Sequence, residues 1–144
     1  MRITKSVLIN RPVEVVWAFV TDLRNTPNWT RSGSELRLTS EGPPHVGATV
    51  EGRRRLFRRF DIKTQGIVIS EYEPNHAFSI DATVPLMGRA NQRLLFEPVA
   101  GGTRLTRSGD LKLRRIIQPL VPRLIGSVWT TELANLKRLI EGAG

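Results

Sequence analysis

Few side chains in this sequence are of the types that carry out acid–base, nucleophilic or metal chemistry. The chain has no cysteine, which excludes thiolate nucleophiles, disulfides and Cys-ligated metals. Its two histidines, His45 and His76, lie in turn-like contexts and have no evident carboxylate or nucleophile partner in the sequence. Isolated turn histidines are usually solvated rather than catalytic. With no phosphate-binding glycine motif either, the sequence predicts no catalytic constellation, no metal site and no cofactor.

Arginine is the most abundant of the side chains that could take part in binding or catalysis. The 22 lysines and arginines outnumber the 13 aspartates and glutamates, the formal net charge is +9, and residues 53–59 hold the densest basic run. Such a run can attract nucleic acid or an anionic membrane, where Phe57 and Phe60 would insert between headgroups. No helix-turn-helix, zinc-finger or RNP motif accompanies the charge. The sequence therefore argues against nucleic acid as a partner and leaves an anionic membrane surface open.

The elements that must position these residues follow from hydrophobic periodicity. Alternation from Arg2 to Ile9 predicts a first strand, and helical spacing predicts two short helices, from Pro12 to Thr21 and from Leu23 to Asn28. From Ser34 to about Leu113 the period is two, with breaks at 57–59, 73–76, 85–88 and 98–102. These breaks are short and rich in turn residues, so the strands should form an antiparallel sheet of consecutive hairpins.

A long amphipathic helix is predicted after the last strand. Apolar residues recur every three or four positions from Leu120 to Ile140, and prolines at 119 and 122 restrict where regular helix begins. We expect helix from near Pro122 to Ile140, stopped by Gly142, covering the dry face of the sheet. The length of 144 residues suits one domain, residues 1–144, with one core.

Targeting signals are not evident in the sequence. There is no run of eighteen apolar residues, and Met1-Arg2 leads directly into alternating residues without the apolar stretch of a signal peptide. We therefore expect a cytoplasmic protein, either a monomer or a homodimer.

The order of elements and several motifs resemble the START-like, or helix-grip, fold of the SRPBCC superfamily, in particular its polyketide cyclase/dehydrase-like members. The most specific motif is Ile-Asn-Arg-Pro-Val-Glu-Val-Val-Trp at 9–17, followed by Asp22 and the Pro-Asn-Trp at 27–29. Later landmarks are the segments 46–48, 71–74 and 96–98 with 102–106. The resemblance implies an α+β fold: a seven-stranded curved antiparallel sheet over a long C-terminal helix, with two short helices after the first strand.

The resemblance further implies a cavity between the sheet and the long helix that takes hydrophobic molecules, lipids or polyketide chains. Each apolar candidate for the cavity lining could contact a ligand or could simply pack in the core. These candidates are Trp17, Trp29, Ile69, Ile80, Leu94, Phe96, Ile125, Trp129 and Leu133.

A cyclase of this family would also need polar groups inside the cavity. Of two neighbouring residues on a strand, one side chain faces inward and the other outward. Each polar candidate could therefore enter the cavity or lie solvated on the outer face. The candidates are Arg53, Arg55, Arg89, Asn91 and Arg107, with Gln65 and Arg93 on the same strands. No catalytic residue can be carried over by position, because the matching landmarks are structural.

Three functions remain open at this point. The first is binding or carriage of a hydrophobic, in one version anionic, small molecule such as a lipid, fatty acid or polyketide-like chain. The second is a polyketide cyclase or dehydratase acting in the same cavity. The third is peripheral binding to an anionic membrane through the basic run at 53–59.

Overall fold

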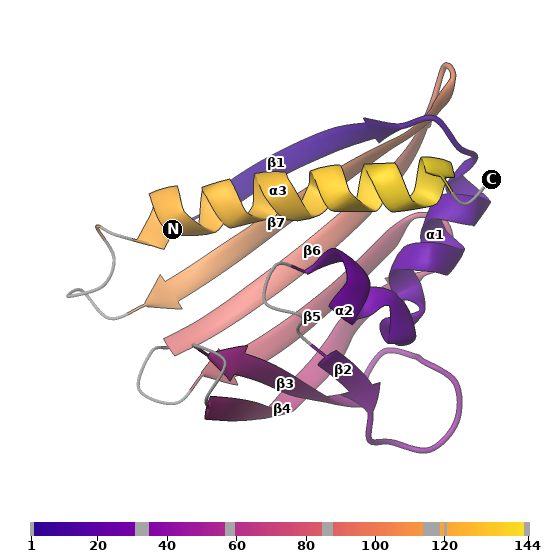
Figure 1. Cartoon of the computed structure of the whole chain (residues 1–144). Helices are drawn as coiled ribbons and strands as arrows, with labels where there is room; N and C mark the ends of the chain where they lie inside the picture. Colours follow the sequence, from indigo (N-terminus) through magenta and orange to yellow (C-terminus); the bar gives the residue numbers. More distant parts are fainter. Residues whose placement is uncertain are drawn as a thin grey trace.

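The computed structural model describes residues 2–30, 35–56, 60–84, 88–113, 119 and 121–142, and it has the predicted α+β helix-grip architecture (Figure 1). The helical elements are α1 (Val13–Thr21), the 3₁₀ turn η1 (Leu23–Asn25), α2 (Thr26–Trp29) and α3 (Val121–Gly142). The strands are β1 (Arg2–Ile9), β2 (Glu35–Leu38), β3 (Thr49–Leu56), β4 (Phe60–Glu73), β5 (Ala77–Val84), β6 (Gly88–Val99) and β7 (Gly102–Leu113). The first strand has the bounds that the alternation predicts.

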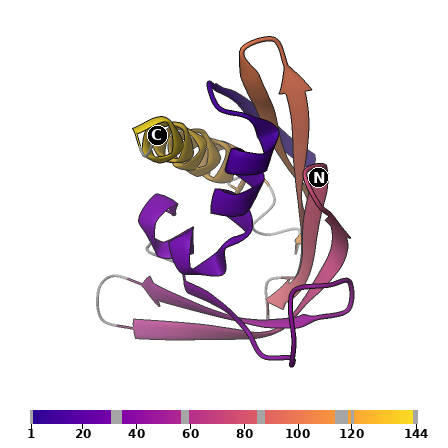
Figure 2. The same cartoon turned by 90° about the vertical axis from the view of Figure 1, so that its right-hand side faces the viewer.

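The seven described strands form one antiparallel sheet in the order β1-β7-β6-β5-β4-β3-β2. Strands β2 to β7 therefore follow one another as hairpins, and β1 closes the series beside β7. The tight β4–β5 connection places Asn75 at φ 63°, a left-handed conformation that asparagine tolerates better than most residues. Figure 2 shows the sheet curling around α1 and α2, with α3 on the same inner side.

The long helix α3 runs beside β1 and across the inner face of the sheet (Figure 1). Its last turn is fastened to the end of β1: the Asn10 N–H donates to Glu141 Oε2 at 2.9 Å, and Lys137 Nζ donates to the Leu8 carbonyl at 2.7 Å. The helix extends slightly beyond both predicted ends. Among the described residues, no helix is both long and apolar enough to cross a membrane.

Two predicted boundaries are wrong in detail. The expected helix over 23–28 is divided into α2 and η1, and Asp22 caps η1 at its start by accepting the Arg24 N–H at 3.1 Å. Pro27 then lies in the first turn of α2, where the amide hydrogen that proline lacks would have no helical partner. The expected break at Pro98 also moves, since Pro98 stays in β6 opposite Thr103 and the turn is confined to 100–101.

Candidate functional site

The inner face of the sheet has two halves that are packed to different degrees. In the packed half, side chains from β1, β6, β7 and α3 are at most 2% exposed: Ile9, Phe96, Leu105, Leu136 and Ile140. In the open half, toward the start of β6 and of α3, inward-facing side chains are only partly buried: Ile80, Ala82, Ala90, Gln92, Leu94 and Ile125. The inner-face side chains are therefore sealed from solvent at one end of α3 and partly accessible to it at the other.

A buried ion pair joins the sheet to α3 between these halves. Arg107 of β7 points inward, and its Nη1 lies 2.7 Å from Glu132 Oε1 on α3. The two side chains are 8% and 7% exposed. The Nε and Nη2 atoms of Arg107 also donate to Gln92 Oε1 of β6, at 3.2 and 2.7 Å. Charges removed from water need such close pairing and additional hydrogen bonds to offset their desolvation.

Two tryptophans flank the Arg107 guanidinium. Its central carbon lies 4.3 Å from the ring centroid of Trp129 on α3 and 5.6 Å from that of Trp29 on α2, both within cation–π range. The Trp129 ring packs directly over Gly109, where a Cβ atom would lie only 2.6 Å from the Trp129 Cη2 atom. We call Arg107, Glu132, Gln92, Trp29 and Trp129 the Arg107 cluster.

Trp29 carries a buried donor that has no partner among the described residues. The residue is 6% exposed, and within the described structure its indole Nε1 is buried without a hydrogen-bond partner. Its backbone carbonyl accepts from Asn135 Nδ2 of α3 at 3.3 Å, which fixes α2 against the long helix. An unsatisfied buried donor costs about 1–3 kcal/mol, so a buried indole N–H of this kind calls for an explanation.

The nine apolar residues predicted to line a cavity divide between these regions. Four lie in the tightly packed core at 8% exposure or less: Trp17, Ile69, Phe96 and Leu133. Within it, the Trp17 ring makes edge contacts with Phe96, Tyr72 and Phe78 at centroid distances of 5.0, 5.4 and 6.4 Å. Three belong to the open half: Ile80, Leu94 and Ile125. Trp29 and Trp129 belong to the Arg107 cluster.

The polar candidates whose side chains are described are not brought together. Arg107 is inside, whereas Arg53 and Arg89 are exposed. Asn91 lies on the outer face, where its amide donates to the Asp81 carboxylate of β5. The side chain of Arg55, like most of the basic run at 53–59, lies outside the described residues, as does that of Gln65. Arg93 of β6 also faces outward and pairs with Glu71.

Sequence reasoning missed the two other polar members of the Arg107 cluster. Glu132 lies three residues after Trp129 and four before Leu136, so helical spacing already places this carboxyl on the apolar face of α3. Gln92 lies two residues before Leu94 and four before Phe96 on β6, so all three side chains point to the inner face. The signal was therefore a polar residue in phase with an apolar stripe.

The remaining titratable groups offer little for catalysis. Both histidines are exposed; His45 Nδ1 lies 2.8 Å from its neighbour's carbonyl, and His76 Nε2 is 3.7 Å from Glu73. In the described part of the chain, no group of three His, Asp or Glu residues could hold a metal ion. The chemistry available in the described interior is therefore that of the Arg107 cluster.

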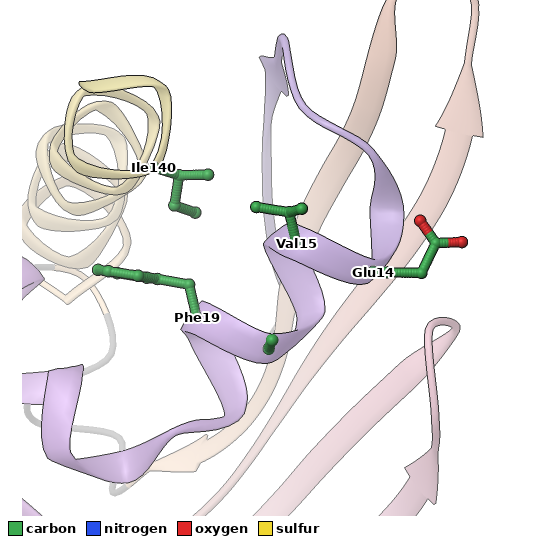
Figure 3. A pocket seen from close by; sticks show the side chains of 5 residues that line it. Glu14, Val15, Phe19 and Ile140 are labelled. Carbon is green, nitrogen blue, oxygen red and sulfur yellow. The ribbon is translucent and has the colours of Figure 1, made fainter. Parts of the chain in front are cut away.

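A separate apolar groove of about 480 Å³ opens on the surface between α1 and the end of α3 (Figure 3). Val15, Phe19 and Ile140 point toward its space, whereas the Glu14 carboxylate points away. The groove lies over the packed half, since Ile140 is 2% exposed and belongs to the main core. It is thus remote along α3 from Ile125 and the open half.

Comparison with known proteins places this geometry in a wider group. A family model described as polyketide cyclase / dehydrase and lipid transport matches residues 1–141, which confirms the predicted resemblance. No curated protein matches the sequence at a significant level.

Solved structures share the fold at low sequence identity. TTHA0849 from Thermus thermophilus superposes with a TM-score of 0.79 at 14% identity, over 100% of this chain and 99% of its own. MLL2253 from Mesorhizobium loti gives a TM-score of 0.77 at 16% identity, again over 100% and 99%. The di-domain ARO/CYC protein StfQ of the steffimycin biosynthetic pathway gives 0.77 at 11% identity, over 99% of this chain but 51% of StfQ.

Proposed function

The chain belongs to the polyketide cyclase/dehydrase and lipid transport family, and on that premise we propose that it binds or carries a hydrophobic small molecule inside the open half. The ligand class is a lipid, a fatty acid or a polyketide-like chain. The observation that carries the proposal is the partial exposure of side chains that face α3 from the sheet. Side chains in a fully packed interior would be as buried as Phe96 and Leu105, which are 0% exposed.

Small residues enlarge the space in the open half. Ala82 and Ala90 face each other in the β5–β6 register on the inner face, and both are only partly buried. Ile80, Leu94 and Ile125 provide apolar walls around them. A mostly apolar site with a few convergent polar groups is the usual form of a small-molecule pocket. The Arg107 cluster supplies those polar groups at the inner limit of the open half.

Native mass spectrometry of protein purified without detergent tests the proposal directly, because a co-purified hydrophobic molecule would identify the ligand class. In parallel, an apolar environment-sensitive dye should bind with micromolar affinity, about −8 kcal/mol, which burial of several methylenes supplies. Ala82→Phe should abolish dye uptake with little loss of stability, since it fills space that the wild type leaves empty.

Ala100→Phe, in the exposed β6–β7 turn, is the matched control and should leave dye binding unchanged. The opposite pattern would contradict the proposal: a wild type that takes up no apolar molecule, together with an Ala82→Phe variant that loses several kcal/mol, describes a solid interior.

One observation favours a second function, a cyclase or dehydratase acting in the same space. Glu132 places a carboxyl group in the interior beside the Arg107 guanidinium, and such groups can move protons and polarise carbonyls. A Glu132→Gln variant separates the two functions. If the protein is an enzyme, this variant should still take up a β-hydroxyacyl thioester but should no longer dehydrate it. A carrier would show no turnover in either form.

A further inference from the structure

In the described part of the chain, the interior beside the open half combines an ion pair with one unused hydrogen-bond donor. Among the described residues, the buried charged side chains are Arg107 and Glu132, which have opposite signs and lie 2.7 Å apart. The unused donor is Nε1 of Trp29. We propose that the ligand is an uncharged hydrophobic molecule with an accepting oxygen, such as a ketone or ester carbonyl, that accepts the Trp29 N–H. This inference rests on the proposed function and narrows its ligand class.

The case for an accepting oxygen comes from the Trp29 indole. Its ring centroid lies 5.6 Å from the Arg107 guanidinium carbon, so the indole borders the polar part of the interior. The residue is 6% exposed, so water does not reach the indole freely. Almost all buried donors in proteins have a partner, and an oxygen on a bound molecule would supply the one that is missing here. A ligand without an acceptor would leave the desolvation cost of this N–H in place.

The case against a charged ligand comes from Arg107. Its guanidinium already donates to Glu132 and to Gln92 and is covered by Trp129 at 4.3 Å. A carboxylate that took over Arg107 would displace Glu132 and leave a second negative charge inside the protein, which is strongly unfavourable. Lys5, opposite Arg107 in the β1–β7 register, is exposed and so does not add a buried charge. A fatty acid should therefore enter in its protonated form.

Three probes with the same nonyl chain test both parts of the proposal: 2-undecanone, its isostere 2-methyl-1-undecene, and decanoate. Dissociation constants are measured by displacement of the apolar dye. In the wild type, decanoate should bind more tightly as the pH is lowered from about 7.5 to 5.5, because more of it is protonated, whereas the affinity for 2-undecanone should not change. This comparison needs no variant.

Trp29→Phe tests the donor, because it removes the indole N–H and keeps an aromatic ring. It should weaken the binding of 2-undecanone about tenfold, which is the scale of one buried hydrogen bond, and leave the affinity for 2-methyl-1-undecene unchanged. Trp17→Phe is the matched control: it removes an indole from the packed core, where Trp17 contacts Tyr72, Phe78 and Phe96, and should affect both probes equally.

Two results would overturn the inference while leaving the proposed function intact. One is an equal effect of Trp29→Phe on the ketone and the alkene. The other is decanoate binding that is as tight as ketone binding at pH 7.5 and independent of pH. If the wild type takes up neither the dye nor any of the three probes, the proposed function itself fails, and this narrowing of its ligand class fails with it.

Discussion

Two arginine–glutamate pairs lie on opposite faces of the same sheet, and they differ mainly in burial. Inside, Arg107 of β7 meets Glu132 of α3 at 2.7 Å with side chains 8% and 7% exposed. Outside, Arg93 of β6 meets Glu71 of β4 at 2.8 Å with side chains 37% and 29% exposed. The two arginines are near neighbours, since Leu94, next to Arg93, is the register partner of Arg107.

The difference shows that similar contacts can have different roles. The outer pair connects two strands at the surface, where water screens each charge and solvates it if the partner is lost. The inner pair is held by Gln92 and covered by tryptophans, so neither charge can return to water without moving α3. We infer that the inner pair fixes the position of the helix over the interior, whereas the outer pair adds little.

Loss of the inner arginine should have the largest effect. Arg107→Met keeps most of the side-chain volume but leaves the Glu132 carboxylate in the interior without its arginine, which should cost about 3–5 kcal/mol. Urea unfolding followed by circular dichroism measures this loss. The double variant Arg107→Met, Glu132→Leu removes both charges and should recover most of the stability. A double variant as unstable as the single one would place the cost in the lost contact with Trp129 instead.

A smaller effect is expected where the Trp129 ring meets the sheet. Gly109→Ala should destabilise the fold by about 1–3 kcal/mol, because the added methyl would lie 2.6 Å from Trp129 Cη2 and 3.0 Å from the Asn91 carbonyl oxygen. It should also quench or shift Trp129 fluorescence as the ring moves from Arg107.

Gly126→Ala is the matched control on the helix side of the same interior. Its new Cβ would lie 3.4 Å from Lys5 Cε, the end of a flexible side chain, and alanine favours a helix by up to about 1 kcal/mol. Thermal unfolding should therefore show opposite shifts for the two variants. A stable Gly109→Ala protein would mean that the ring can move without cost and does not hold Arg107 in place.

The inner and outer pairs also show what the sequence could predict. Periodicity predicted the strands and α3, because apolar spacing in each stretch matches one period only. Alternation could also have separated the two arginines, since Arg93 is out of phase with Leu94 and Phe96 on β6, whereas Arg107 is in phase with Leu105 on β7. Glu132 was in phase with Trp129 and Leu136 and could have been found. The unused Trp29 N–H could not, because its burial depends on how α2 packs against α3.

The outer pair should give the smallest effect and a distinct dependence on pH. The Arg93 guanidinium holds the pKa of Glu71 below its ordinary value of 4.5, with a further hydrogen bond from Ser79 Oγ at 2.8 Å. A carboxyl whose pKa is lower in the folded state binds fewer protons there than in the unfolded chain, so its contribution to stability is complete above pH 4.5 and is lost as the pH falls through the folded pKa.

Arg93→Met should therefore cost about 0.2–1 kcal/mol at pH 7, and less at high salt. The difference in urea midpoint between wild type and variant should narrow below pH 4.5, as the Glu71 carboxylate becomes protonated. A difference that stays constant down to strongly acidic pH would show that the charge on Glu71 plays no part, and that Arg93 acts through the packing of its aliphatic stem.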